Sequence, residues 1–102
     1  MRRRRAVLSN ILKSNAFTDF EKKVYRATAR IWRGEVRSYK WVAKTVGSPH
    51  AYRAVGNALN KNLYTEVIPC HRVIKSDGTI GGYAKGVKAK RRILRSEGVD
   101  GV

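Results

Sequence analysis

The sequence predicts one small, mainly α-helical domain: a winged-helix-like helix-turn-helix, followed by a short strand or loop region that carries the single cysteine, Cys70. A chain of 102 residues is long enough for one modest hydrophobic core. Apolar residues recur at helical spacing in several stretches, and Gly and Pro separate these stretches. From residue 64 onward, strand-like runs and turn signals interrupt the helical period.

Residues 1–16 are expected to form a basic N-terminal arm and lead-in, and residues 17–102 the domain itself. The run Arg2–Arg5 is interpreted as a flexible arm. It is charged like the start of a secretion signal, but Ala6–Leu8 is too short for the apolar core of such a signal. Residues 7–14 fit either a short helix or an irregular lead-in.

An amphipathic helix is predicted over 19–32. Thr18 and Glu21 have the spacing of a capping box, and Gly34 ends the helix. Its apolar stripe consists of Phe20, Val24, Ala27 and Ile31.

Two shorter helices follow, over 39–46 and 50–60. Ser38 caps the first, Gly47 ends it, and Ser48-Pro49 opens the second. Two short helices joined by a tight turn with Gly and Pro predict a helix-turn-helix.

Beyond this motif, 64–68 is predicted as a strand and 72–74 as extended chain. A turn at 76–78 leads into either a short hairpin or an irregular loop. The last helix is predicted over 87–96, with its apolar side at Val87, Ile93 and Leu94 and its cations elsewhere, and Glu97-Gly98 closes it. Those cations are Lys88, Lys90, Arg91, Arg92 and Arg95.

The charge balance points to a polyanionic partner. The chain has 23 Lys and Arg against 7 Asp and Glu, a net charge of +16. Such an excess is typical of proteins that bind nucleic acid. Adaptation to high temperature usually adds charges of both signs, and no stretch approaches the ~20 apolar residues that a membrane span needs.

Cys70 is the most informative single residue. A lone cysteine cannot form an internal disulfide, and it cannot complete a zinc site with only His50 and His71 to help. Two interpretations remain from the spacing alone: a small buried core residue, or a thiol that acts as a nucleophile. A nucleophilic thiol must ionise, and His71 and Arg72 follow it directly.

The predicted helix 50–60 suits a groove that it does not read base by base. It has few of the Asn and Gln side chains that pair with base edges. Arg53 stands alone among small residues, which are Ala51, Ala54, Gly56 and Ala58. An ordinary solvated helix charge is the alternative interpretation of Arg53.

These motifs together resemble the DNA-binding and catalytic domain of the O6-alkylguanine-DNA alkyltransferases. The resemblance covers roughly 17–98. It rests on Pro69-Cys70-His71-Arg72-Val73, Gly81-Gly82-Tyr83, Lys90 and Ser96-Glu97-Gly98, and upstream on Gly34-Glu35-Val36, Ser38-Tyr39, Arg53-Ala54-Val55-Gly56 and Asn62.

The resemblance implies a catalytic set. Cys70 would accept the alkyl group permanently, His71 would act on the thiol proton through a bridging water, and Glu97 would hold the His71 ring. Asn62 would brace the active-site turn. Tyr39 would help to rotate the target nucleotide and would donate a hydrogen bond to the departing guanine.

The resemblance also implies how DNA is held. Arg53 would fill the gap that an extruded base leaves, on a helix whose small residues Ala51, Ala54 and Gly56 approach the duplex. Tyr83 and the main chain around Val73 and Ala84 would line the base pocket. Singly, each of these residues also has an ordinary structural interpretation.

The implied function is irreversible, single-turnover repair of O6-alkylguanine, with O4-alkylthymine as an open second substrate. No cofactor or metal is implied. The expected partner is double-stranded DNA containing alkylated guanine, bound by a monomer inside the cell: in the cytoplasm of a prokaryote or the nucleus of a eukaryote.

Three departures and two rival functions accompany this expectation. Leu63, which follows Asn62, and Trp32 each stand where the family usually has proline. The usual separate N-terminal domain would also be lacking, which predicts a minimal form. One rival is an alkyltransferase-like protein that only flags lesions, but such proteins replace the acceptor cysteine. The other is a plain DNA-packaging or regulatory helix-turn-helix protein.

Overall fold

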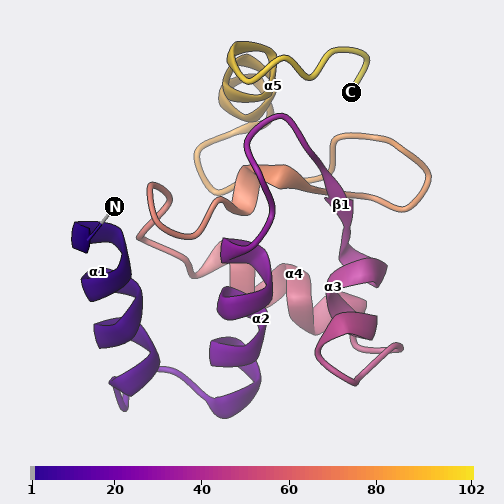
Figure 1. Cartoon of the computed structure of the whole chain (residues 1–102). Coiled ribbons are helices and arrows are strands. Elements are labelled where there is room, and N and C mark those ends of the chain that lie inside the picture. The colour runs from indigo at the N-terminus through magenta and orange to yellow at the C-terminus, as the bar shows by residue number, and fades with distance from the viewer. Residues whose placement is uncertain (1) are drawn as a thin grey trace.

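A computed structural model describes residues 2–102 of the protein, with side chains from Arg5 onward. Three helices form one half of the fold. They are α2 (Asp19–Ala29), α3 (Tyr39–Thr45) and α4 (Tyr52–Asn60), and they pack on one another (Figure 1). Val24, Val42 and Val55 are fully buried where these helices meet. The predicted capping box is formed, because Thr18 accepts from the Glu21 amide and Glu21 accepts from the Thr18 amide.

Helix α1 (Arg2–Lys13) lies beside α2. The prediction of a flexible N-terminal arm is therefore wrong where the backbone is described. Of the arm predicted over 1–5, Met1 and the side chains of 2–4 lie outside the described residues. From Arg2 the backbone is helical and continues into the 7–14 segment, whose Ile11 is buried in the core. Arginine is a good helix former, so the tract extends a helix that Ile11 anchors.

The helix-turn-helix is confirmed as α3 and α4 joined by a tight turn. The turn is closed by hydrogen bonds from the Ser48 amide to the Ala43 carbonyl (2.9 Å) and from the Ala51 amide to the Ser48 carbonyl (2.9 Å). Ser38 caps α3 through the Trp41 amide. Helix α4 begins two residues later than predicted because this turn holds His50 and Ala51 outside the helix.

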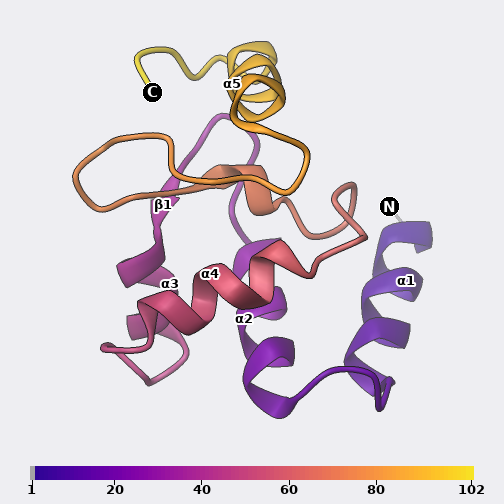
Figure 2. The same cartoon turned by 180° about the vertical axis from the view of Figure 1, so that it is seen from behind.

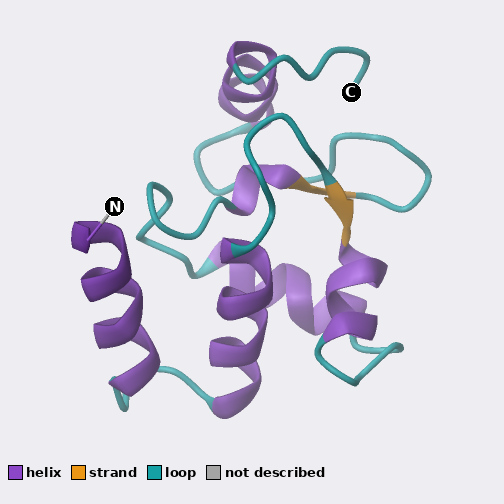
Figure 3. Ribbon diagram, in the orientation of Figure 1, coloured by secondary structure: helices purple, strands orange, loops and turns teal. Residues whose placement is uncertain are grey.

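One prediction for the region between Asn62 and Ile80 is wrong, and an alternative that the sequence left open there is decided. Residues 64–68 form a helical turn instead of a strand, with the Val67 and Ile68 amides both donating to the Tyr64 carbonyl. The extended pair β2 (Val73–Ile74) does not fold into a hairpin (Figure 3). It pairs in parallel with β1 (Arg37–Ser38), with Arg37 opposite Val73. This parallel pairing connects the cysteine segment to the helix-turn-helix.

Helix α5 (Val87–Ser96) has the predicted bounds but not the predicted faces. Leu94 is buried and packs with Ile74 and Ile80. Lys90, expected on the polar side, is fully buried. Positions 87, 90 and 94 share one face of a helix, so Lys90 lies on the inward stripe. Over residues 2–102, no helix combines the length and apolar character that crossing a bilayer requires.

Candidate active site and nucleic-acid interface

Cys70 opens a single 3₁₀ turn, η1 (Cys70–Arg72), between Pro69 and β2. Its side chain is enclosed, with 6% of the residue exposed. The turn is closed by a hydrogen bond from the Arg72 amide to the Pro69 carbonyl (2.9 Å), and Val73 and Ile74 then enter the β1–β2 pair. The thiol therefore sits on a short segment that is fixed on both sides.

Asn62 braces the loop that precedes the thiol, as the resemblance implied. Its Nδ2 donates to the Ile68 carbonyl (2.8 Å), and its Oδ1 accepts from the Tyr64 amide (2.8 Å). The buried Asn62 side chain also acts to lower the pKa of the Cys70 thiol, against the effect of burial. Asn62 therefore closes the loop that leads to Cys70 and fixes the backbone before the thiol turn.

Glu97 joins two neighbours of the thiol. Its Oε1 lies 3.0 Å from His71 Nε2, and Arg72 holds both carboxylate oxygens through Nε (3.0 Å) and Nη2 (2.8 Å). Burial disfavours the carboxylate, but the hydrogen bonds from Arg72 and His71 outweigh burial and hold the Glu97 pKa below its usual value. Arg72 thus supplies the counter-charge, and Glu97 is free to orient the His71 ring.

His71 is suited to accept a proton at neutral pH. Burial lowers the pKa of its ring, although Glu97 opposes this effect. The ring is therefore neutral near pH 7. Because a carboxylate can only accept, the ring proton sits on Nε2, and Nδ1 is left as the basic nitrogen.

Lys90 is the buried cation next to the thiol. Its Nζ donates to the carbonyls of Val73 (2.7 Å) and Gly82 (3.0 Å), and it lies 5.7 Å from the centre of the Tyr39 ring. Burial lowers the pKa of Lys90 to about 8. The ammonium ties the thiol segment to the 81–84 loop.

The thiol itself is not strongly activated in this state. Burial raises the Cys70 pKa above its ordinary value, while the Asn62 hydrogen bond and the charge of Lys90 act in the opposite direction. Ionisation therefore depends on these neighbours and on a base. Within the described part of the chain, no three His, Cys, Asp or Glu side chains gather closely enough to hold a metal ion.

Tyr39 stands between the thiol region and the helix-turn-helix. Its hydroxyl donates to the Gly82 carbonyl (3.4 Å), and burial together with the nearby Cys70 raises its pKa. A Cβ at Gly81 would lie 3.1 Å from the Tyr39 ring, and Gly81 has a φ of 72°. Both the contact and the backbone conformation therefore require glycine there. On the other side, the Tyr39 ring approaches Gly56 of α4.

The predicted pocket residues are only partly brought together. Tyr83 is half-buried, and burial followed by its contact with Cys70 raises its pKa. The Val73 carbonyl already accepts from Lys90, and Ala84 is exposed in a turn. Of these three residues, Tyr83 is the one whose pKa the Cys70 thiol raises.

A surface groove of about 420 Å³ runs between α4 and the 75–77 loop. Tyr39, Arg53 and Gly56 line it, so three of the predicted DNA-binding residues share one groove. Ala54 is exposed on α4, and Ala51 is the half-buried residue that precedes the helix. The other lining residues are Lys40, Tyr52, Lys75, Ser76 and Asp77.

Sequence reasoning assigned no role to two residues of the site, Arg72 and Lys90. Lys90 could have been found, because it lies four positions before the buried Leu94 on the same face of the helix. Arg72 carries no comparable signal, since its partner Glu97 is 25 positions away.

Comparison with known proteins identifies the family. Residues 19–99 match the family model described as the DNA-binding domain of 6-O-methylguanine DNA methyltransferase. The chain belongs to this family. A relative in Methanosarcina barkeri, named methylated-DNA–protein-cysteine methyltransferase, is 51% identical over 80 residues, which are 78% of this chain and 51% of that protein. The chain thus spans about half the length of the curated relatives that it matches.

Solved structures of similar proteins have the same fold. Mycobacterium tuberculosis OGT in complex with DNA has a TM-score of 0.78 and 43% identity, covering 80% of this chain and 50% of that one. S. pombe Atl1, solved with DNA containing O6-carboxymethylguanine, has a TM-score of 0.73 and 36% identity, covering 80% and 78%. The helical fold with a small two-stranded sheet is therefore the fold of this family.

Proposed function

We propose that this chain repairs DNA by transferring an alkyl group irreversibly from the O6 atom of guanine to the sulfur of Cys70. The observation that carries the proposal is the setting of the thiol. It is enclosed, and both Asn62 and the Lys90 ammonium favour its ionised form, in a chain of the methyltransferase family. A cysteine that served only as core would not need polar neighbours.

The step is a displacement at the alkyl carbon. The Cys70 thiolate attacks that carbon, an S–C bond forms, and the C–O6 bond breaks. The electron pair stays on guanine, which takes up a proton and remains in the DNA. The product is an unreactive thioether, so each molecule reacts once.

Two residues move the protons in this proposal. Nδ1 of neutral His71 takes the thiol proton through a water, while Glu97 fixes the ring through Nε2. The Tyr39 hydroxyl leaves the Gly82 carbonyl and donates to the departing guanine. The positive charge of Lys90 stabilises the anionic sulfur as the proton leaves.

The alkylated base must first leave the helix, because the O6 atom lies inside the stacked pair. The groove between α4 and the 75–77 loop holds the duplex, and Arg53 enters the gap in the stack. Phosphate contacts from the basic surface supply affinity without reading sequence, which suits damage at any position. The proposed functional unit is a monomer on double-stranded DNA.

Intact mass measurement tests the proposal. Incubation with excess duplex containing O6-methylguanine should add one methyl mass, located on the peptide that contains Cys70. The Cys70→Ser variant should bind the same duplex and gain no mass. An unchanged mass in the reduced wild-type protein, with binding retained, would instead favour a lesion-flagging role like that of the alkyltransferase-like proteins. Equal affinity for damaged and undamaged DNA would favour a plain packaging role.

A further inference from the structure

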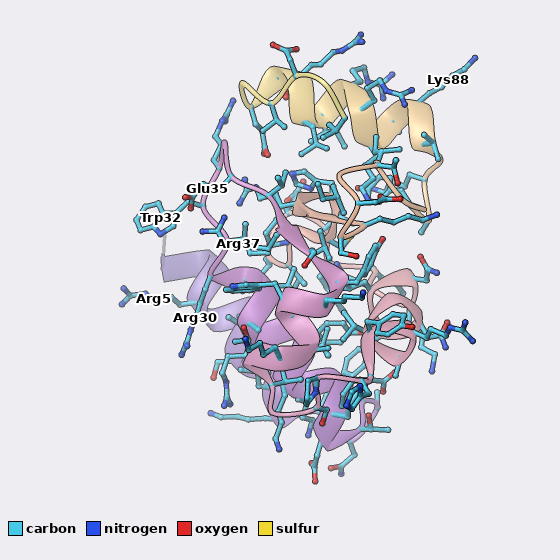
Figure 4. The ribbon with its side chains drawn as sticks, turned by 90° about the vertical axis from the view of Figure 1, so that its right-hand side faces the viewer. Arg5, Arg30, Trp32, Glu35, Arg37 and Lys88 are labelled. Atoms are coloured by element: carbon cyan, nitrogen blue, oxygen red, sulfur yellow. The ribbon has the colours of Figure 1, made fainter. Side chains whose placement is uncertain are left out.

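The outer face of α5 carries a stripe of three cations, Lys88, Arg92 and Arg95, called here the α5 stripe. The spacing of four and three residues places them along one side of the helix. All three side chains are exposed, and Figure 4 shows Lys88 pointing away from the body of the molecule. Lys90 turns inward, and Arg91 is half-buried and donates to the Val102 carbonyl (3.0 Å).

The fold does not explain the α5 stripe. Like charges four residues apart destabilise a helix by roughly 0.2–0.5 kcal/mol. The first turn of α5 contains no acidic residue, and Lys88 there opposes the helix dipole. Among the side chains that the structure describes, the ion pairs are Arg37–Glu35, Lys61–Glu21, His71–Glu97 and Arg72–Glu97. None of them involves the stripe.

The α5 stripe lies far from the groove that contains Arg53. Figures 1 and 2 show α5 at one end of the molecule, with β1 and the cysteine segment between it and helices α3 and α4, from both sides. The longest extent of the molecule is 37 Å. A duplex held against α4 therefore leaves the outward side of α5 open.

We propose that the α5 stripe binds the phosphate backbone of a second DNA duplex while α3 and α4 hold the first, so that one molecule bridges two duplexes. The first contact rests on the proposed function. Cations at regular spacing without base-reading partners suit phosphates, which carry no sequence information. Bridging allows the protein to pass directly from one DNA segment to another while it searches for damage.

A membrane surface fits the stripe less well than DNA does. An interfacial helix buries a wide apolar face in the bilayer. In α5, Leu94 is buried in the protein and Ile93 is half-buried, so the apolar side is already occupied. Only Val87, at the first residue of the helix, is an exposed large apolar side chain.

Energy transfer between two duplexes tests the proposal. One duplex carries a donor dye and the other an acceptor, and wild-type protein at low salt should bring them together. The variant Lys88→Gln, Arg92→Gln, Arg95→Gln should lose the transfer signal several-fold. It should bind a single duplex and transfer methyl to Cys70 as wild type does. Because the three side chains are exposed, thermal unfolding should confirm an unchanged fold.

A matched variant separates a localised site from total charge. Lys23→Gln, Arg26→Gln, Arg30→Gln removes the same charge from the exposed side of α2, and it should keep the bridging signal. Equal losses in the two triple variants, or bridging that survives in the α5 variant, would overturn the proposal. If wild-type protein bridges two duplexes but transfers no methyl group, that result would contradict the proposed function and leave the bridging proposal intact.

Discussion

At the scale of single residues, the thiol depends on one buried charge. Lys90 is 0% exposed, and its ammonium favours the Cys70 thiolate against the effect of burial. A positive charge lowers the pKa of a thiol, so its removal raises that pKa. The same ammonium also donates hydrogen bonds to two carbonyls, so this one side chain supplies the charge and also fixes the backbone of the site.

The first residue-scale prediction concerns pH. Replacing Lys90 by Met should move the alkylation of Cys70 by iodoacetamide to higher pH, because the thiol loses its nearest cation. The measurement is the rate of alkylation against pH, followed by mass. Lys88→Met, on the exposed side of the same helix, is the control and should leave the profile unchanged. Coincident profiles for wild type and Lys90→Met would show that Lys90 has only a structural role.

His71 gives the second residue-scale prediction. The His71→Ala variant should lose the proton acceptor and slow methyl transfer by ~10²–10⁴-fold, the usual contribution of a general base. Affinity for DNA should change little, because His71 is buried away from the surface. Single-turnover rates at saturating DNA measure the first quantity and a binding titration the second. A wild-type transfer rate would assign activation to the cationic surroundings instead.

At the scale of elements, Tyr39 at the start of α3 connects two parts of the site. It touches Gly56 of α4 on one side and the 81–82 segment on the other. The parallel pair β1–β2 repeats this connection, since β1 leads directly into α3 and β2 follows the thiol turn. Tyr39 and the β1–β2 pair therefore connect the helix-turn-helix to the thiol segment in two places.

Arg53 on α4 provides the prediction at this scale. Arg53→Ala should slow methyl transfer from duplex DNA, because extrusion leaves a hole that costs a few kcal/mol of lost stacking. Transfer from the free base O6-benzylguanine should remain near the wild-type rate, since it needs no extrusion. Lys44→Ala, an exposed cation on α3, is the control for lost charge. Equal losses on both substrates would mean that Arg53 supports the fold.

At the scale of the whole molecule, the large positive net charge is the main feature that bears on DNA binding. The net charge of +16 is spread over several faces of a small domain, and the ion pairs described above neutralise only a small part of it. Binding through phosphates is then strongly salt-dependent, with about −0.9 in the slope of log affinity against log salt for each phosphate neutralised.

The Arg2–Arg5 tract tests this view. Deleting residues 1–5 should weaken binding to unmodified and methylated duplex equally and flatten the salt slope. Transfer at saturating DNA should stay nearly constant, because Cys70, His71 and Glu97 are untouched. Binding titrations between low and physiological salt measure the slope. An unchanged slope would show that the tract does not contact DNA.

The local signals in the sequence were sufficient to predict α2, α3, α4 and α5, but not α1. The capping box at Thr18, the Ser38 cap and the Gly and Pro around residue 48 act within a few residues, so the helix-turn-helix followed from pattern alone. The run around Cys70 pointed to a reactive thiol for the same reason. These features depend on neighbours in the chain, which a sequence displays directly.

Only the tertiary structure decided which distant groups meet at the thiol. The turn at 64–68 replaced the predicted strand because Asn62 binds the Ile68 carbonyl and closes the loop. Lys90 turned inward to the carbonyls of Val73 and Gly82, and Glu97 was shared between His71 and Arg72. Apart from the Asn62 loop, each of these contacts joins residues 8 to 26 positions apart. Such contacts form because a buried polar group must find a partner, and packing, which the local pattern does not encode, determines the partner.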